Sequence, residues 1–237
     1  MASGFPGFSP ETLQFFRGLA RNNNREWFLP RKPIFEEHVK APMRQLVEQI
    51  NGAMKAFAPD YVTDPAKAIY RFYRDTRFSK DKSPYKTQIA ASFHHRGLGG
   101  EGGGYYFAVS HKELAVGGGI YMPSPETLRA VRGHMADHHK EFRRIVRRAA
   151  VRNLLGKPQG EQLSRAPKGF PPDHPAADLL RFKQFLLYIE LPPEITATPA
   201  VRAEVVKRFR AMTPFLSFLN APLLSKAKRI DPRELLI

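Results

Sequence analysis

Four short runs of aromatic and β-branched residues, separated by glycine-rich or charged turns, limit what this chain can fold into more than any other feature. The runs cover residues 69–73, 86–95, 104–110 and 114–122. Such runs are typical of β-strands that are joined by short connections. We therefore expect one largely antiparallel sheet over about residues 69–122.

Three consecutive glycines, residues 117–119, lie inside the fourth run. Glycine inside a strand permits a bulge, or the close approach of a ligand or of another backbone. The sequence therefore predicts an unusually close contact at this point of the sheet.

The sequence on both sides of these runs predicts helices. One is expected to begin at Pro10, because proline suits the first helical position. Residues 32–57 carry apolar side chains at helical spacing, and Pro42 is expected to kink this segment or break it into two helices. Further helices are expected over residues 173–186 and 198–212. The predicted fold class is α+β, with the sheet packed by N-terminal and C-terminal helices.

A chain of 237 residues fits one domain better than two equal domains. We expect a flexible N-terminal lead over residues 1–8 and a single α+β domain over residues 9–237. Hydrophobic residues make up 42% of the chain, and phenylalanine occurs 18 times. This composition excludes a disordered or fibrous protein and predicts a core rich in phenylalanine.

The chain contains no cysteine. Disulfides, thiolate nucleophiles and cysteine metal sites are therefore excluded. The N-terminal residues lack the basic start and apolar run of a signal peptide, and no window reaches the roughly 18 apolar residues of a membrane span. We expect a cytoplasmic protein without a membrane span, and the sequence leaves its oligomeric state open.

The chain is strongly basic. Thirty-eight lysines and arginines stand against 22 aspartates and glutamates, which gives a formal net charge of +16. A field of this sign raises the local concentration of polyanions such as nucleic acids, anionic lipid surfaces or phosphorylated metabolites. Part of the excess lies on one predicted helical face, over residues 140–148. That face either contacts a phosphate backbone or is simply a solvated helix surface.

Residues 69–87 concentrate arginines, lysines and tyrosines in a short stretch. Guanidinium groups on a loop suit bidentate binding of phosphate or carboxylate, and lysines there add point charge. We therefore expect this stretch to form a pocket for a phosphorylated or otherwise anionic small molecule. The predicted anion-binding residues are Arg71, Arg74, Arg77, Lys82, Tyr85 and Lys86.

Two aspartates in this stretch, Asp75 and Asp81, are the only nearby candidates for general acid or base catalysis. Asp75 lies beside Arg74 and Arg77, so it is most simply a partner that fixes these arginines, with a lowered pKa. Asp81 is suited to cap a turn through its side chain. Enzymatic turnover is therefore left open. No cofactor is expected, because the sequence has neither a phosphate-loop signature nor a dinucleotide fingerprint.

Two groups of histidines raise the question of a metal site. His94 and His95 lie near a strand end, and His134 and His138 are spaced i, i+4 on a helix, which is the minimum for two zinc ligands. Neither group comes with an HExxH pattern or a third placed ligand. Exposed helix histidines are the preferred interpretation, and no metal is predicted.

Four ordered motifs carry a resemblance to a known family. They are residues 22–28 (NNNREWF), residues 71–86 (RFYRDTRFSKDKSPYK), the glycines at 117–119 and residues 169–175 (GFPPDHP). With these motifs the chain resembles the family known as domain of unknown function 2461, from about Phe8 to about Phe209. The resemblance implies a single-domain, soluble protein found mainly in bacteria. It points to the same central stretch but implies no catalytic residues, because that family has no assigned activity.

The geometry around the central arginines separates three possible functions. A concave site that encloses them would favour binding of an anionic small molecule. A flat basic track that joins them to Arg143 and Arg147 would favour nucleic acid, with Tyr73 and Tyr85 available to stack on bases. Arginines fully paired with carboxylates inside the core would favour a protein-interaction module without a ligand.

Overall fold

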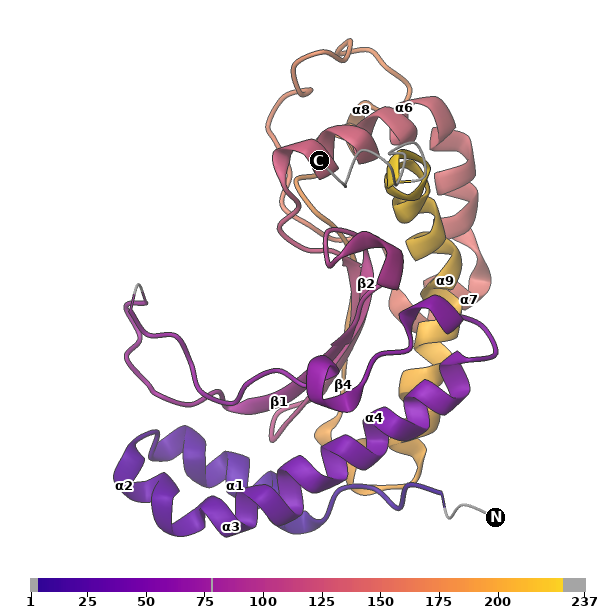
Figure 1. Cartoon of the computed structure of the whole chain (residues 1–237). Coiled ribbons are helices and arrows are strands. Elements are labelled where there is room, and N and C mark those ends of the chain that lie inside the picture. Colours follow the sequence, from indigo (N-terminus) through magenta and orange to yellow (C-terminus); the bar gives the residue numbers. More distant parts are fainter. Residues whose placement is uncertain (1–3, 78, 228–237) are drawn as a thin grey trace, which may run out of the picture.

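The computed structural model describes residues 4–77 and 79–227, and within them it has one sheet of four antiparallel strands (Figure 1). The strands lie in the order β1-β2-β3-β4. Three of them fall inside the region predicted to form the sheet, and the α+β fold class is confirmed. The strands are β1 Gln88–Phe93, β2 Gly104–Ser110, β3 Leu114–Ile120 and β4 Phe185–Leu191.

The longest helix, α9, packs against β3, and α4, α6 and α7 pack against α9 in turn. The short helices α1, α2 and α3 gather below β1 in Figure 1. No helix in the described part of the chain has the length and apolar character needed to cross a membrane. The helices are α1 Pro10–Arg21, α2 Arg25–Phe28, α3 Lys32–Ile34, α4 Ala41–Met54, α5 Pro65–Ala68, α6 Pro125–Arg147, α7 Ala149–Leu155, α8 Ala177–Leu180 and α9 Ala200–Ala227, with a π-helical turn η2 at Phe35–Lys40 and 3₁₀ turns η1 at Leu29–Arg31, η3 at Pro59–Tyr61, η4 at Arg96–Leu98 and η5 at Pro193–Ala197.

The fourth strand replaces part of a predicted helix. The apolar pattern predicts a helix over residues 173–186, but the structure has only the four-residue α8 there, followed by β4. β4 pairs with β3 along its whole length, and Phe185 and Leu187 point into the core. The prediction was wrong because short helices and buried strands share such a pattern, and pairing with a strand distant in sequence decides between them.

Residues 69–73, predicted to be a strand, do not join the sheet as one. Only single bridges link Ile69 to Ala91 and Tyr73 to Tyr85. The chain contacts the edge of β1 once and then leaves it, because the ring of Phe72 packs among the aromatic rings of the N-terminal helices. This segment therefore lies between the sheet and those helices.

Pro42 does not break the helix that contains it. Helical conformation continues from α3 through the π-helical turn η2 into α4. Pro42 has no amide hydrogen for the carbonyl oxygen four residues earlier, which belongs to His38. The hydroxyl of Thr12, in α1, donates a hydrogen bond to this oxygen instead. A side chain from another helix thus supplies the donor that proline lacks.

The N-terminal segment is anchored where a flexible lead was expected. Phe5 and Phe8 are 3% and 2% exposed, and their rings pack edge to face. The amide of Phe5 donates to Gln49 Oε1 at 3.0 Å, and the amide of Phe8 donates to the carbonyl oxygen of Thr196 at 2.8 Å. Phe5 and Phe8 therefore belong to the core and anchor this segment. Residues 1–3 and 228–237 lie outside the described residues.

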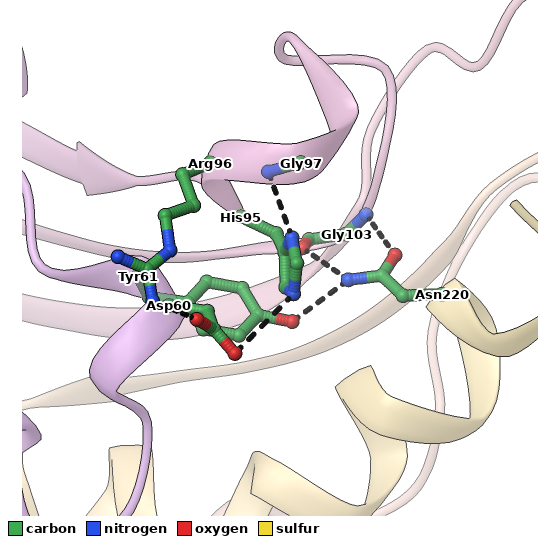
Figure 2. A network of polar contacts seen from close by, with 7 residues as sticks. All are labelled: Asp60, Tyr61, His95, Arg96, Gly97, Gly103 and Asn220. Carbon is green, nitrogen blue, oxygen red and sulfur yellow. Dashed lines mark hydrogen bonds and ion pairs between the residues drawn. The ribbon is translucent and has the colours of Figure 1, made fainter. Parts of the chain in front are cut away.

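A buried amide joins three distant segments (Figure 2). Asn220, in α9, is 1% exposed. Its Nδ2 donates to the hydroxyl of Tyr61 at 2.7 Å and to the carbonyl oxygen of Gly103 at 2.9 Å, and its Oδ1 accepts from the Gly103 amide at 2.7 Å. Beside this network, His95 Nε2 lies 3.8 Å from a carboxylate oxygen of Asp60. Because every polar atom of the Asn220 side chain is paired, its burial is not costly.

The three glycines of β3 allow close packing on two sides, as their position predicted. A Cβ atom on Gly118 would lie 2.6 Å from Met212 Sδ in α9. Gly119 has a φ of +142°, and a Cβ atom there would overlap the carbonyl oxygen of Phe185 in β4. These glycines let β3 contact β4 and α9 at distances that a side chain would prevent.

We predict that Gly119→Ala lowers the free energy of unfolding by about 2–4 kcal/mol, because the backbone angle and the overlap with β4 both oppose a side chain. Urea denaturation followed by circular dichroism measures the change. Gly133→Ala is the matched control: Gly133 lies in α6 with open space where its Cβ would be. This control should raise the stability by about 0.5–1 kcal/mol. Equal effects of the two substitutions would contradict the packing argument.

Candidate functional site

The central stretch forms a narrow two-stranded ribbon beyond the edge of β1. The amide of Arg74 donates to the carbonyl oxygen of Pro84 at 2.9 Å, and the amide of Lys86 donates to that of Phe72 at 3.0 Å. The loop between the two halves projects away from the sheet in Figure 1. This ribbon and its loop carry the residues predicted to bind an anion.

Aromatic packing fixes the ribbon on the N-terminal helices. The ring centres of Tyr85 and Phe28 are 4.3 Å apart, and those of Phe72 and Phe35 are 4.2 Å apart. The side chain of Asn23 accepts a hydrogen bond from the Tyr85 amide at 3.1 Å and donates one to the Tyr85 carbonyl oxygen at 2.9 Å. The motifs at residues 22–28 and 71–86 therefore meet in space and hold each other.

Two of the three central arginines are occupied by aspartates. Arg77 makes a bidentate pair with Asp75, with Nε–Oδ1 and Nη2–Oδ2 distances of 3.0 and 2.8 Å. Arg74 Nη1 donates to Asp81 Oδ2. Arg71 is held more loosely, since its Nη2 lies 3.7 Å from the Asp75 oxygen that Arg77 already contacts. Of these three arginines, Arg71 needs the smallest rearrangement to bind a ligand.

The other predicted anion-binding residues also have internal partners. Lys82 Nζ donates to the carbonyl oxygen of Thr76 at 3.0 Å. Tyr85 is 3% exposed, and burial raises the pKa of its hydroxyl. Lys86 Nζ lies 5.1 Å from the centre of the Tyr70 ring, and burial lowers the pKa of this lysine. An anion-binding role for these residues stays a prediction.

Both candidate acid–base residues are stabilised as carboxylates. The side-chain hydrogen bond from Arg77 lowers the pKa of Asp75. Hydrogen bonds from Ser83, and then from Arg74, lower the pKa of Asp81 to about 2. A carboxylate that is stabilised in this way is a weak base at neutral pH. This arrangement favours structural roles for the two aspartates.

A hollow of about 380 Å³ lies between the N-terminal helices and residues 65–73; we call it the N-terminal hollow. The buried rings of Phe28, Phe35 and Phe72 form its floor. Arg71 is the member of the predicted anion-binding set that lines it. The charged residues around the hollow are Lys32, Glu36, Lys40, Arg44 and Arg71.

Three cations of the N-terminal hollow were missed by sequence reasoning. They recur with Glu36 at every fourth position along α3, η2 and α4, so they share one side of this helical segment. Lys40 Nζ lies 2.7 Å from Glu36 Oε2, and Arg44 Nε lies 3.4 Å from Glu48 Oε1. The ammonium group of Lys32 has no hydrogen bond or ion pair with any described residue. The four-residue spacing was the available signal.

The basic residues 140–148 lie in another part of the molecule. They occupy the end of α6 and its junction with α7, on the far side of the sheet and α9 from the ribbon in Figure 1. Among the described residues, a flat basic track that joins the central arginines to Arg143 and Arg147, the feature that would have favoured nucleic acid at the central stretch, is therefore not formed. The two groups of cations have to be considered separately.

The histidines do not assemble a metal site in the described part of the chain. No three side chains of His, Cys, Asp or Glu come together there in a suitable arrangement. The rings of His134 and His138 do face each other, 4.5 Å apart, as their spacing predicts. Burial lowers the pKa of His134.

Comparison with known proteins identifies a family. The model of a family described as "Conserved hypothetical protein (DUF2461)" matches residues 11–218. No curated protein and no solved structure matches the chain.

We predict that the Asp81 carboxyl titrates with a pKa of about 2, as a midpoint in carbon-detected NMR. Because this pKa is lowered, the carboxylate's support of the loop is complete above the ordinary value of about 3.9. That support is lost as the pH falls through about 2. Ser83→Ala and Arg74→Gln should each raise the midpoint, since each removes a side-chain hydrogen bond that lowers this pKa. A wild-type midpoint near the ordinary value would contradict this account.

Proposed function

Since this chain belongs to the DUF2461 family of conserved hypothetical proteins, we propose its function from its own geometry: the N-terminal hollow binds a small molecule that carries both a planar apolar group and an anionic group. The observation that carries this proposal is the hollow itself, in which an aromatic floor lies beside cations that internal carboxylates do not fully neutralise. Its volume of about 380 Å³ is in the range of small-molecule sites.

The floor suits a flat apolar group. Phe28, Phe35 and Phe72 are 1%, 5% and 8% exposed, so their rings are held by neighbours and only a small part of each reaches the hollow. Tyr70 and Tyr73 also line the hollow and are 44% and 55% exposed. Aromatic rings prefer stacked or edge-to-face contacts with another ring. A heterocycle or phenyl group would therefore gain most of its ring contact from Tyr70 and Tyr73 at the sides and a smaller part on the floor.

The rim suits a phosphate or carboxylate. Lys32 has no ion pair among the described residues, and Arg71 has only the loose contact with Asp75. Arginine binds phosphate and carboxylate in a bidentate manner, and lysine adds a point charge. Lys40 and Arg44 each have a glutamate partner and supply further positive potential. The Lys32 and Arg71 pair is therefore the proposed contact for the anionic group.

The proposal covers recognition and assigns no reaction. Asp75 and Asp81 are bound by arginines, and neither lines the hollow. Glu36 is the carboxylate of the rim, and it is paired with Lys40 at 2.7 Å.

We predict that the aryl phosphate 4-methylumbelliferyl phosphate binds the protein saturably in isothermal titration calorimetry. The double variant Lys32→Ala/Arg71→Ala should bind it at least tenfold more weakly, because each charge-assisted contact contributes about 1.5–3 kcal/mol. Inorganic phosphate should also bind more weakly than the aryl phosphate, because it cannot use the aromatic floor. Both variant side chains are exposed, so the fold should be kept.

The matched control is Lys157→Ala/Arg165→Ala, which removes the same charge from exposed positions between α7 and α8. It should leave the affinity unchanged. Equal losses in the two double variants would attribute binding to net charge and would overturn the proposed site. Equal affinity for inorganic phosphate and the aryl phosphate would overturn the role of the aromatic floor.

A further inference from the structure

A second hollow, far from the first, is walled by cations. It has a volume of about 430 Å³, lies open along the end of α6, and is the feature that we call the α6 groove. Every residue that lines it is a lysine or an arginine. The lining residues are Lys140, Arg143, Arg144, Arg147 and Arg148.

Most of this charge is not neutralised within the described structure. Arg143 has a carboxylate partner, Asp178, with Nη2–Oδ1 and Nη1–Oδ2 distances of 2.7 and 3.1 Å, and it also donates to the carbonyl oxygen of Pro175. The charged groups of the other four residues make no hydrogen bond or ion pair with any described residue. Arg143 is therefore fixed in place, while its four neighbours face solvent with their charge intact.

The spacing of these cations is unfavourable for an isolated helix. Lys140 and Arg144, and likewise Arg143 and Arg147, are four residues apart, and like charges at this spacing repel by a few tenths of a kcal/mol per pair. Cations near a helix C-terminus do gain from the helix dipole. The helix dipole does not explain why these cations line one shared groove. An anion bound in the groove would offset the repulsion between them.

The chain turns at the end of the groove in a way that adds one more cation. Arg148 has φ −56° and ψ +135°, so it leaves the helical conformation between α6 and α7. Its side chain nevertheless lines the same groove as the α6 residues. The cations thus follow a line of eight residue steps, roughly 12 Å at the helical rise.

We propose that the α6 groove binds the phosphate backbone of duplex nucleic acid without reading its sequence. Duplex DNA carries one charge per roughly 1.7 Å of axis, so a line of this length faces several phosphates. The groove has no aromatic or amide side chain in its lining that could stack on a base or read its edge. It is open along its length, which suits a long polyanion better than an enclosed small molecule.

The test uses the full chain and a fluorescently labelled 20-base-pair DNA duplex, with fluorescence anisotropy recorded between 50 and 200 mM salt. We expect saturable binding that is independent of duplex sequence. Four free cations predict a slope of log K against log salt of about −3 to −4. The triple variant Lys140→Ala/Arg144→Ala/Arg147→Ala should lose at least tenfold in affinity and flatten the slope by about 3.

A matched triple variant, Lys32→Ala/Arg44→Ala/Arg71→Ala, removes the same charge from the N-terminal hollow and should leave duplex binding unchanged. Equal losses in both triple variants would mean that net charge alone causes binding, and would overturn the proposal. Binding of inorganic phosphate at the groove without binding of the duplex would also overturn it, in favour of a small anion. Because the aryl phosphate experiment uses other residues, failure of one proposal leaves the other testable.

Discussion

The close contact of β3 with both β4 and α9 is the constraint on which the rest of this structure depends. Gly118 and Gly119 leave room for Met212 and for the Phe185 carbonyl oxygen, so α9 lies directly on the sheet. α4, α6 and α7 then pack against α9. Both proposed sites are built on helices of this layer, the N-terminal hollow partly on α4 and the α6 groove at the end of α6. Their separation across the molecule follows from this arrangement.

Charge density in the sequence and available charge in the structure are different quantities here. The central stretch is rich in arginine, but Asp75 and Asp81 hold Arg77 and Arg74, and the aromatic rings of the stretch fix it on the N-terminal helices. Among the cations of the N-terminal hollow, Lys32 has no partner in the described residues, and it comes from a helical segment that the composition did not single out. The arginine-rich central stretch is therefore mainly an anchored segment. The proposed ligand site is the N-terminal hollow beside it.

The sequence predicted what depends on neighbouring residues and missed what depends on distant ones. β2 was predicted over its observed residues, because its composition and its glycine-rich borders are local. β4 was missed, because its partner β3 lies far away along the chain. In the same way, Arg71 was among the residues predicted to bind an anion and lines the N-terminal hollow, while Lys32 and Arg44, which also line it, were not predicted. The spacing of Lys32 and Arg44 by a multiple of four residues is visible in the sequence. Which part of the molecule their side of the helix faces depends on tertiary packing.

The hydrogen bond from Thr12 to the carbonyl oxygen of His38 also bears on how the N-terminal region folds. The helical segment around Pro42 cannot satisfy that oxygen with the amide four residues later, because proline has none. Docking of α1 therefore supplies a hydrogen bond that this helical segment lacks by itself, and we expect the two elements to stabilise each other. Pro42, which removes a hydrogen bond from its own helix, thus couples the stability of that helix to α1, roughly thirty residues earlier in the chain.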